Sequence, residues 1–251
     1  MYRSFFLKLL LFISTCAPSL YGFNSEAGNS GSLGTGFLVG GYATFHIFYF
    51  HTKDQTFDLF GDEIEQGLWE YDSIQRAPGG GGFIGYGISF CERFTLALKA
   101  AATGYSSEAK HSYYDDSPVL VYPNKMKVKY IVDLSLEPGA KLGNCFLLYA
   151  KFGPSYVGWR QTRQILLNEL PFQVVGEDKS HFHNWGYVFG AGVDTLISRC
   201  VSAFIEFDGH SYPFNNSKRH VDNSNDASED LDYRVTRLYG FGFRFGLSAE
   251  F

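Results

Sequence analysis

Charged residues are scarce in this 251-residue chain, at 19%, and the formal net charge is -5 at pH 7. This balance excludes a basic nucleic-acid-binding domain and a disordered acidic tail. No long leucine-rich run follows the N-terminus, which excludes a bundle of membrane-spanning helices. Glycine, with 28 residues, and aromatic residues, at 18%, are instead abundant. The composition therefore favours a β-rich globular protein or a membrane barrel.

The N-terminal segment has the features of an export signal. Arg3 and Lys8 supply early positive charge, a short apolar run covers residues 5–13, and Leu20-Tyr21-Gly22 offers a cleavage site. The apolar run is too short to cross a membrane as a helix. We therefore predict a signal peptide over residues 1–22, cleaved after Gly22, and one exported domain over residues 23–251.

The end of the chain alternates strictly between bulky apolar residues and small or charged ones. A period of two indicates a strand with two different faces. A continuous apolar face opposite a small, polar face is typical of a strand with lipid outside and a narrow polar interior. The apolar positions are Tyr239, Phe241, Phe243, Phe245, Leu247, Ala249 and Phe251.

The same alternation occurs in seven further segments, near residues 33–50, 84–90, 94–102, 126–136, 146–156, 184–197 and 201–207. In the segment 126–136 the pattern predicts Met126, Val128 and Val132 facing outward. A sheet of such strands in lipid must close by pairing its first strand with its last, because every unpaired backbone group there costs several kcal/mol. The predicted fold is all-β, an eight-stranded antiparallel transmembrane up-and-down β-barrel.

The connections between these segments are of two alternating kinds. Three are tight, at residues 91–93, 143–145 and 198–200, and four are long and polar, at about 51–80, 106–125, 161–182 and 213–231. Short periplasmic turns and long surface loops are expected of outer-membrane barrels. The pattern predicts a cell outer membrane location with both ends of the mature chain in the periplasm.

The alternation also assigns a set of charged residues to the barrel interior. An eight-stranded barrel is just wide enough to be filled by side chains, so these charges are predicted to pair with one another. They could form a structural plug or a narrow ion path, and the small diameter favours the plug. The predicted interior charges are Lys99, Lys127, Lys129, Asp133, Glu137, Lys151, Asp194, Glu206, Asp208, Arg244 and Glu250.

Three stretches resemble the opacity-protein and OmpA-like family of eight-stranded outer-membrane barrels. The glycine-rich residues 190–194, a tight turn and the acid-bearing residues 201–208 are similar to the penultimate hairpin of that family, and residues 150–156 to its fifth strand. Phe251 resembles the signal read by the outer-membrane assembly machinery, although Ala249 is smaller than the family's usual residue. The resemblance implies outer-membrane lipid and that machinery as partners, and a role in adhesion, envelope integrity or small pores without enzyme chemistry.

The three cysteines of the mature chain, Cys91, Cys145 and Cys200, each lie in one short turn. Neighbouring turns stand two strands apart, about 10 Å, whereas a disulfide requires Cα atoms within about 7 Å. Two hypotheses remain open. The thiols form intermolecular disulfides with periplasmic partners or like chains, or they are small turn residues without any bond.

The long loops are the predicted recognition elements. The first contains an excess of acids interleaved with Phe57, Phe60, Trp69 and Tyr71. It could bind a basic host or envelope ligand, as could the loop at 213–231, or it could simply solvate the barrel mouth.

Neither a metal site nor an active site is predicted. The acidic run at residues 222–226 has Ala227 where a calcium loop requires glycine and Tyr233 where it requires glutamate. His210 and Ser211 are adjacent and so point to opposite faces, and no serine of matching spacing accompanies His181 and His183. We therefore expect no cofactor and no enzyme activity, with a narrow pore and a lipid-modifying enzyme as the alternatives to envelope structure and adhesion.

Overall fold

The computed structural model describes the backbone of residues 33–57, 69–90, 93–114, 121–143, 145–167, 173–198, 200–214, 218–219 and 230–251. The predicted signal peptide, Cys91 and the acidic run at 222–226 lie outside these residues. No helix among the described residues is long and apolar enough to cross a membrane.

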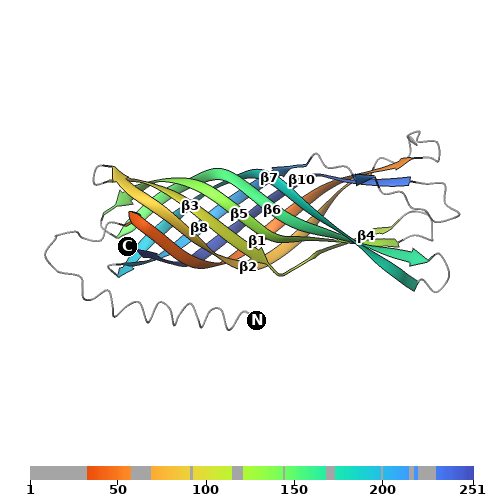
Figure 1. Ribbon diagram of the computed structural model, residues 1–251, viewed down its shortest axis with the longest axis horizontal. Helices are drawn as coiled ribbons and strands as arrows, with labels where there is room; N and C mark the ends of the chain where they lie inside the picture. Colours follow the sequence, from red (N-terminus) through yellow and green to blue (C-terminus); the bar gives the residue numbers. More distant parts are fainter. Residues whose placement is uncertain are drawn as a thin grey trace. The chain divides into compact units, whose positions relative to one another are not determined.

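Ten strand elements are present: β1 (Gly36–Phe57), β2 (Trp69–Phe90), β3 (Phe94–Tyr105), β4 (Ala109–Tyr114), β5 (Val121–Leu142), β6 (Phe146–Leu167), β7 (Gln173–Ser198), β8 (Val201–Pro213), β9 (Lys218–Arg219) and β10 (Asp230–Glu250). Each is antiparallel to its neighbours (Figure 1). β4 continues the line of β3 along β5, and β9 continues that of β8 along β10. The ten elements thus make eight strands.

The sheet closes on itself because β1 pairs with both β2 and β10. The closure extends to the last residue, where the amide of Phe37 donates to the Phe251 carbonyl at 3.0 Å and the amide of Phe251 donates to the Phe37 carbonyl at 2.9 Å. A closed ring leaves neither edge strand without a partner. The predicted eight-stranded antiparallel barrel is therefore confirmed.

The two faces of the barrel wall differ in the way the alternation predicts. Large apolar side chains face outward on every one of the eight strands, and many are more exposed than buried, such as Trp185 at 69% and Ile205 at 67%. Their neighbours in sequence point inward and are buried, for example Asn184 and Glu206. The apolar side chains that dominate the outside form the surface here called the apolar belt.

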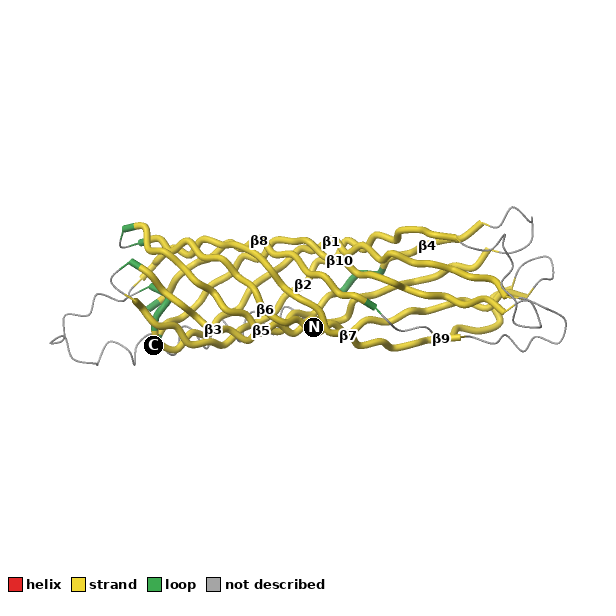
Figure 2. The backbone as a smooth tube through the Cα atoms, turned by 90° about the horizontal axis from the view of Figure 1, so that it is seen from above, coloured by secondary structure: helices red, strands yellow, loops and turns green. Residues whose placement is uncertain are grey.

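The strands are longer than the alternation predicted. β1 and β2 each have 22 residues, whereas about 9–11 tilted residues cross a bilayer. Most of the predicted loop at 51–80 is consequently strand, with only 58–68 outside the described backbone, and parts of 106–125, 161–182 and 213–231 are strand as well. The short turns lie at the end that holds the C-terminus, and the extensions project from the other end (Figures 1 and 2). The sequence prediction missed these extensions because the outer apolar residues that mark the alternation give way to polar ones, such as Lys127 and Arg160.

A β-bulge in β5 corrects the predicted orientation of four residues. Val128 pairs with Trp159 and Tyr130 with Gly158, so Lys129 is an extra residue without a partner on β6. Met126 and Val128 are consequently inside the barrel, at 1% and 0% exposure, instead of outside. Lys127 and Lys129, predicted inside, instead lie on the outer face. A strict period of two cannot anticipate the phase change that one inserted residue causes.

Glycines on β10 make room for rings from the neighbouring strands. A Cβ atom at Gly242 would lie 2.5 Å from Cγ of His46, and one at Gly240 would lie 2.5 Å from the ring of Phe48. Such distances are far below van der Waals contact. The small residues between the apolar positions of β10 therefore allow large side chains to fill a narrow interior.

Candidate functional site in the barrel lumen

The centre of the lumen is a network of charges supplied by four strands. Arg244 of β10 places Nη2 2.8 Å from Asp133 of β5 and 2.7 Å from Asp208 of β8, with Nη1 3.7 Å from Glu206. Lys151 of β6 bonds Glu206 at 2.9 Å. All five side chains are buried. Buried charges persist when they are paired in this way, since isolated ones would be very costly.

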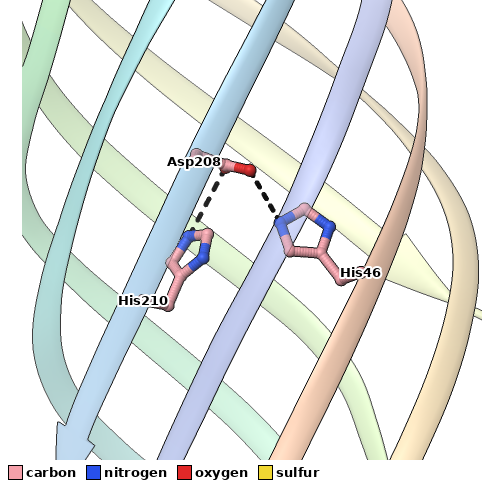
Figure 3. Close-up of side chains that lie close together, drawn as sticks. All are labelled: His46, Asp208 and His210. Carbon is pink, nitrogen blue, oxygen red and sulfur yellow. Dashed lines mark hydrogen bonds and ion pairs between the residues drawn. The ribbon is translucent and has the colours of Figure 1, made fainter.

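Two histidines adjoin this network, and Figure 3 shows them on either side of Asp208. His46 Nε2 lies 2.8 Å from Asp208 Oδ1, and its Nδ1 lies 2.8 Å from Thr44 Oγ1 and 3.2 Å from the Tyr105 hydroxyl. With the proton on Nε2, Nε2–H donates to the Asp208 carboxylate and the Tyr105 hydroxyl donates to Nδ1, while the Thr44 hydroxyl donates to the Phe243 carbonyl.

His210 makes looser contacts than His46. Its Nε2 lies 3.3 Å from Asp133 Oδ1 and 3.9 Å from Asp208 Oδ2. Its Nδ1 is buried without a hydrogen-bond partner among the described residues. The ring is held by stacking on Tyr212, with centroids 6.0 Å apart, and the Tyr212 hydroxyl lies 2.6 Å from Ser155 Oγ, which donates to Asp133.

A second set of charges lies nearer the short turns. Lys99 Nζ bonds Glu137 at 2.7 Å. The Gly34 amide donates to Glu250 at 3.1 Å. Asp194 and Glu250 each retain one buried oxygen without a hydrogen-bond partner among the described residues. Acids therefore outnumber bases in this layer.

Nine of the eleven predicted interior charges lie in these two layers, and Lys127 and Lys129 do not. Prediction from the sequence missed His46 and His210 as members of the network, although both are in phase with inward-facing neighbours: His46 with Thr44, and His210 with Glu206 and Asp208. That phase relation was the signal that could have identified them.

Apolar side chains fill the lumen beyond the central network. Toward the extended end, Phe48, Phe50, Val128, Trp159 and Leu238 belong to one buried cluster. Toward the turns, Tyr42, Phe83 and Phe204 form the centre of another. Two cavities found in the described lumen measure about 10 Å³ each, the space of a single water molecule.

His46, Asp208 and His210 offer ligand atoms within 4.8 Å of one another. Imidazole and carboxylate groups suit zinc. The guanidinium of Arg244, however, lies 2.7 Å from the same carboxylate and opposes a second cation. The carboxylates of Asp133, Glu206 and Asp208 already face two cations, Lys151 and Arg244. This pairing disfavours a metal ion at the three ligand atoms.

Two of the predicted turn cysteines are described, and both are free thiols. Cys145 is exposed and Cys200 is partly exposed. Their backbones belong to the sheet, since the Cys145 carbonyl accepts from the Leu196 amide and the Cys200 carbonyl from the Glu250 amide, both at 2.9 Å. The turns that carry these thiols are therefore anchored while the Cys145 side chain faces solvent.

No protein-family model matches the sequence. No curated protein matches it either. Among solved structures, the chain is similar to the outer membrane protein OprG from Pseudomonas aeruginosa, at 12% identity and a TM-score of 0.46, covering 87% of this chain and 99% of that one. It is also similar to Neisserial surface protein A, at 10% identity and 0.40, covering 82% and 97%.

The attachment invasion locus protein Ail of Yersinia pestis, solved in complex with the heparin analogue sucrose octasulfate, is 10% identical with a TM-score of 0.32, covering 81% of this chain and 98% of that one. Identities this low bear on the fold alone.

Proposed function

We propose that the protein is an outer-membrane β-barrel that contributes to envelope structure and surface adhesion through the extended end of its strands. The observation that carries the proposal is the apolar belt on a closed barrel. Soluble monomers rarely expose contiguous apolar patches larger than a few hundred Å². A ring of exposed side chains such as Phe94, Phe152 and Phe243 instead suits hydrocarbon.

The filled lumen favours this role over that of a pore. Ion conduction requires a continuous wet path, whereas ion pairs and aromatic rings occupy the described lumen from Trp159 to Tyr42. A water path past these side chains would require unpairing buried charges. We therefore expect refolded protein in planar bilayers to give no discrete conductance steps.

The proposed function is also non-enzymatic. Thr44, His46 and Asp208 line up a hydroxyl, an imidazole and a carboxylate. The Thr44 hydroxyl, however, donates to the Phe243 carbonyl at 2.9 Å, and all three side chains are buried in the lumen. A lipid substrate outside the wall has no route to them, so we expect no fatty-acid release when the protein is incubated with phospholipid.

Insertion into vesicles tests the membrane assignment directly. Protein refolded in detergent should keep β-sheet circular dichroism, migrate differently before and after boiling, and insert into phosphatidylcholine vesicles. A compact monomer that stays soluble without detergent would contradict the proposal.

Adhesion needs a separate test at the extended end. β1 ends at Phe57 and β2 begins at Trp69, so replacing residues 58–68 with a short glycine-serine turn would leave both strands intact. Cells that display this variant should adhere less to cultured epithelial cells than cells with the full chain. Equal adherence, with equal surface amounts, would exclude this connection as the adhesive element.

A further inference from the structure

The outer face of three neighbouring strands changes from aromatic to basic at one position along the barrel. On β6 the change runs from Tyr156 to Arg160, and on β7 from Trp185 to His181. On β5 the bulge places Lys127 and Lys129 on the same outer face, nearer the extended end than Tyr130. We call Lys127, Lys129, Arg160 and His181 the basic patch.

Sheet register brings the members of the patch together. Lys127 pairs with Arg160, and Arg160 pairs with His181. Lys129 Nζ donates to His181 Nδ1 at 3.2 Å. Lys125 and Lys179 flank the patch one row further along, on either side of Thr162. The basic side chains thus form one continuous surface across three strands.

One described carboxylate lies within this surface. Glu108 is 3.0 Å from Arg160 and 3.7 Å from Lys127. Lys127, Lys129 and Arg160 therefore carry three permanent positive charges against one negative charge. The Lys129 ammonium also lowers the pKa of the exposed His181 side chain. A nearby anion would stabilise the positive charges of two basic groups in contact at an exposed site.

The position of the basic patch relative to the apolar belt indicates which anion would bind to it. Tyr156 and Trp185 are in contact with their rings tilted by 55° and the centroids 5.0 Å apart, and Tyr156 stacks on His183. Amphipathic rings concentrate where hydrocarbon meets head groups. Cations just beyond such rings lie at the level of lipid head groups, where phosphate is the matching charge.

We propose that the basic patch binds phosphate groups on the head groups of lipids that surround the extended end of the barrel. The inference rests on the proposed membrane location. It gives the patch a role in fixing the depth and lipid neighbours of the barrel.

Lipid retention tests the proposal on the full refolded chain. Protein in mixed micelles of detergent with lipid A, which carries phosphomonoesters, is compared with protein in detergent with zwitterionic phosphatidylcholine, and bound lipid is measured by native mass spectrometry. We expect preferential retention of lipid A. In the combined variant K127Q/K129Q/R160Q the affinity for lipid A should fall at least about tenfold, since each basic residue near an anionic surface contributes on the order of 1 kcal/mol.

Two further variants separate local binding from general attraction. Glu108→Gln removes the acid from the patch and should strengthen lipid A retention. Arg76→Gln with Arg237→Gln removes two exposed cations elsewhere on the wall and should leave it unchanged. Equal retention by the wild-type chain and the combined variant, or an equal loss in the Arg76 and Arg237 control, would overturn the proposal.

Two comparisons distinguish the possible failures. Displacement of lipid A by an equal concentration of inorganic phosphate would show that the patch takes free phosphate and not a lipid. A wild-type chain that inserts into phosphatidylcholine vesicles without preferring lipid A refutes this inference alone. A chain that does not insert refutes the proposed function together with it.

Discussion

Arg244 and Asp208 form a buried ion pair of 2.7 Å between neighbouring strands at the centre of the lumen. The same guanidinium binds Asp133 from β5, which lies on a non-adjacent strand of the barrel. One cation thus links strands that share no backbone hydrogen bonds. The ion pairs of Arg244 therefore connect β10, β8 and β5 through the filled lumen.

The first prediction concerns this cation. Arg244→Met keeps the apolar stem and leaves Asp133 and Asp208 buried without their main counter-charge. Breaking a buried pair from one side costs about 3–5 kcal/mol. We expect the free energy of unfolding in urea, measured in detergent micelles, to fall by that amount.

A compensating variant serves as the control for this prediction. Asp208→Asn added to Arg244→Met removes one stranded negative charge and should recover part of the loss. If Arg244→Met alone left the urea midpoint unchanged, the network would not stabilise the barrel.

The second prediction concerns the contact of His46 with Gly242. A valine at 242 would place its Cβ 2.5 Å from the imidazole and 2.5 Å from the Phe45 carbonyl. Overpacking of this kind costs about 1–3 kcal/mol. Gly242→Val should therefore lower the free energy of unfolding, whereas Gly104→Val, whose nearest neighbour would be 4.0 Å away, should have little effect. Equal losses in the two variants would refute the steric explanation.

The alternation of the sequence was enough to predict the barrel, because an apolar outer face and a packed interior impose opposite chemistry on successive residues. At β10 every second residue from Phe241 to Leu247 faces outward as expected. Toward the extended end, past Tyr130, the outer face becomes polar, as at Lys127 and Arg160. There the backbone continues as strand without the pattern that marks it.

The pairing within the lumen could not be predicted from sequence. The alternation of the sequence assigns Asp133, Asp208 and Arg244 to the interior. Their ion-pair partners, however, depend on strand tilt and on which side chains from opposite walls meet. Histidines are ambiguous for another reason, since they suit a lumen, a membrane interface or an exposed surface equally well. His46 is buried in the lumen, whereas His183 is exposed on the outer face and stacks on Tyr156.

The third prediction follows from the bulge. Because Lys129 is the unmatched residue of β5, deleting it leaves Val128 facing inward and Tyr130 outward. We expect this deletion variant to fold, with a change in unfolding free energy of about 1 kcal/mol or less. Deleting Leu136 instead would reverse the faces of residues up to the bulge and remove Asp133 from Arg244. That variant should show no heat-modifiable band, and a normal band would show that the register is not fixed by the lumen.

The fourth prediction concerns the turn thiols. Cys145 is exposed and Cys200 only partly so, hence maleimide should label Cys145 faster in the folded protein. If these two thiols cross-link the envelope, disulfide-linked species on non-reducing gels of alkylated native envelopes, in a Cys91→Ser background, should be lost in Cys145→Ser and largely retained in Cys200→Ser. A single monomer band from the wild-type chain would leave both cysteines as turn residues without any bond.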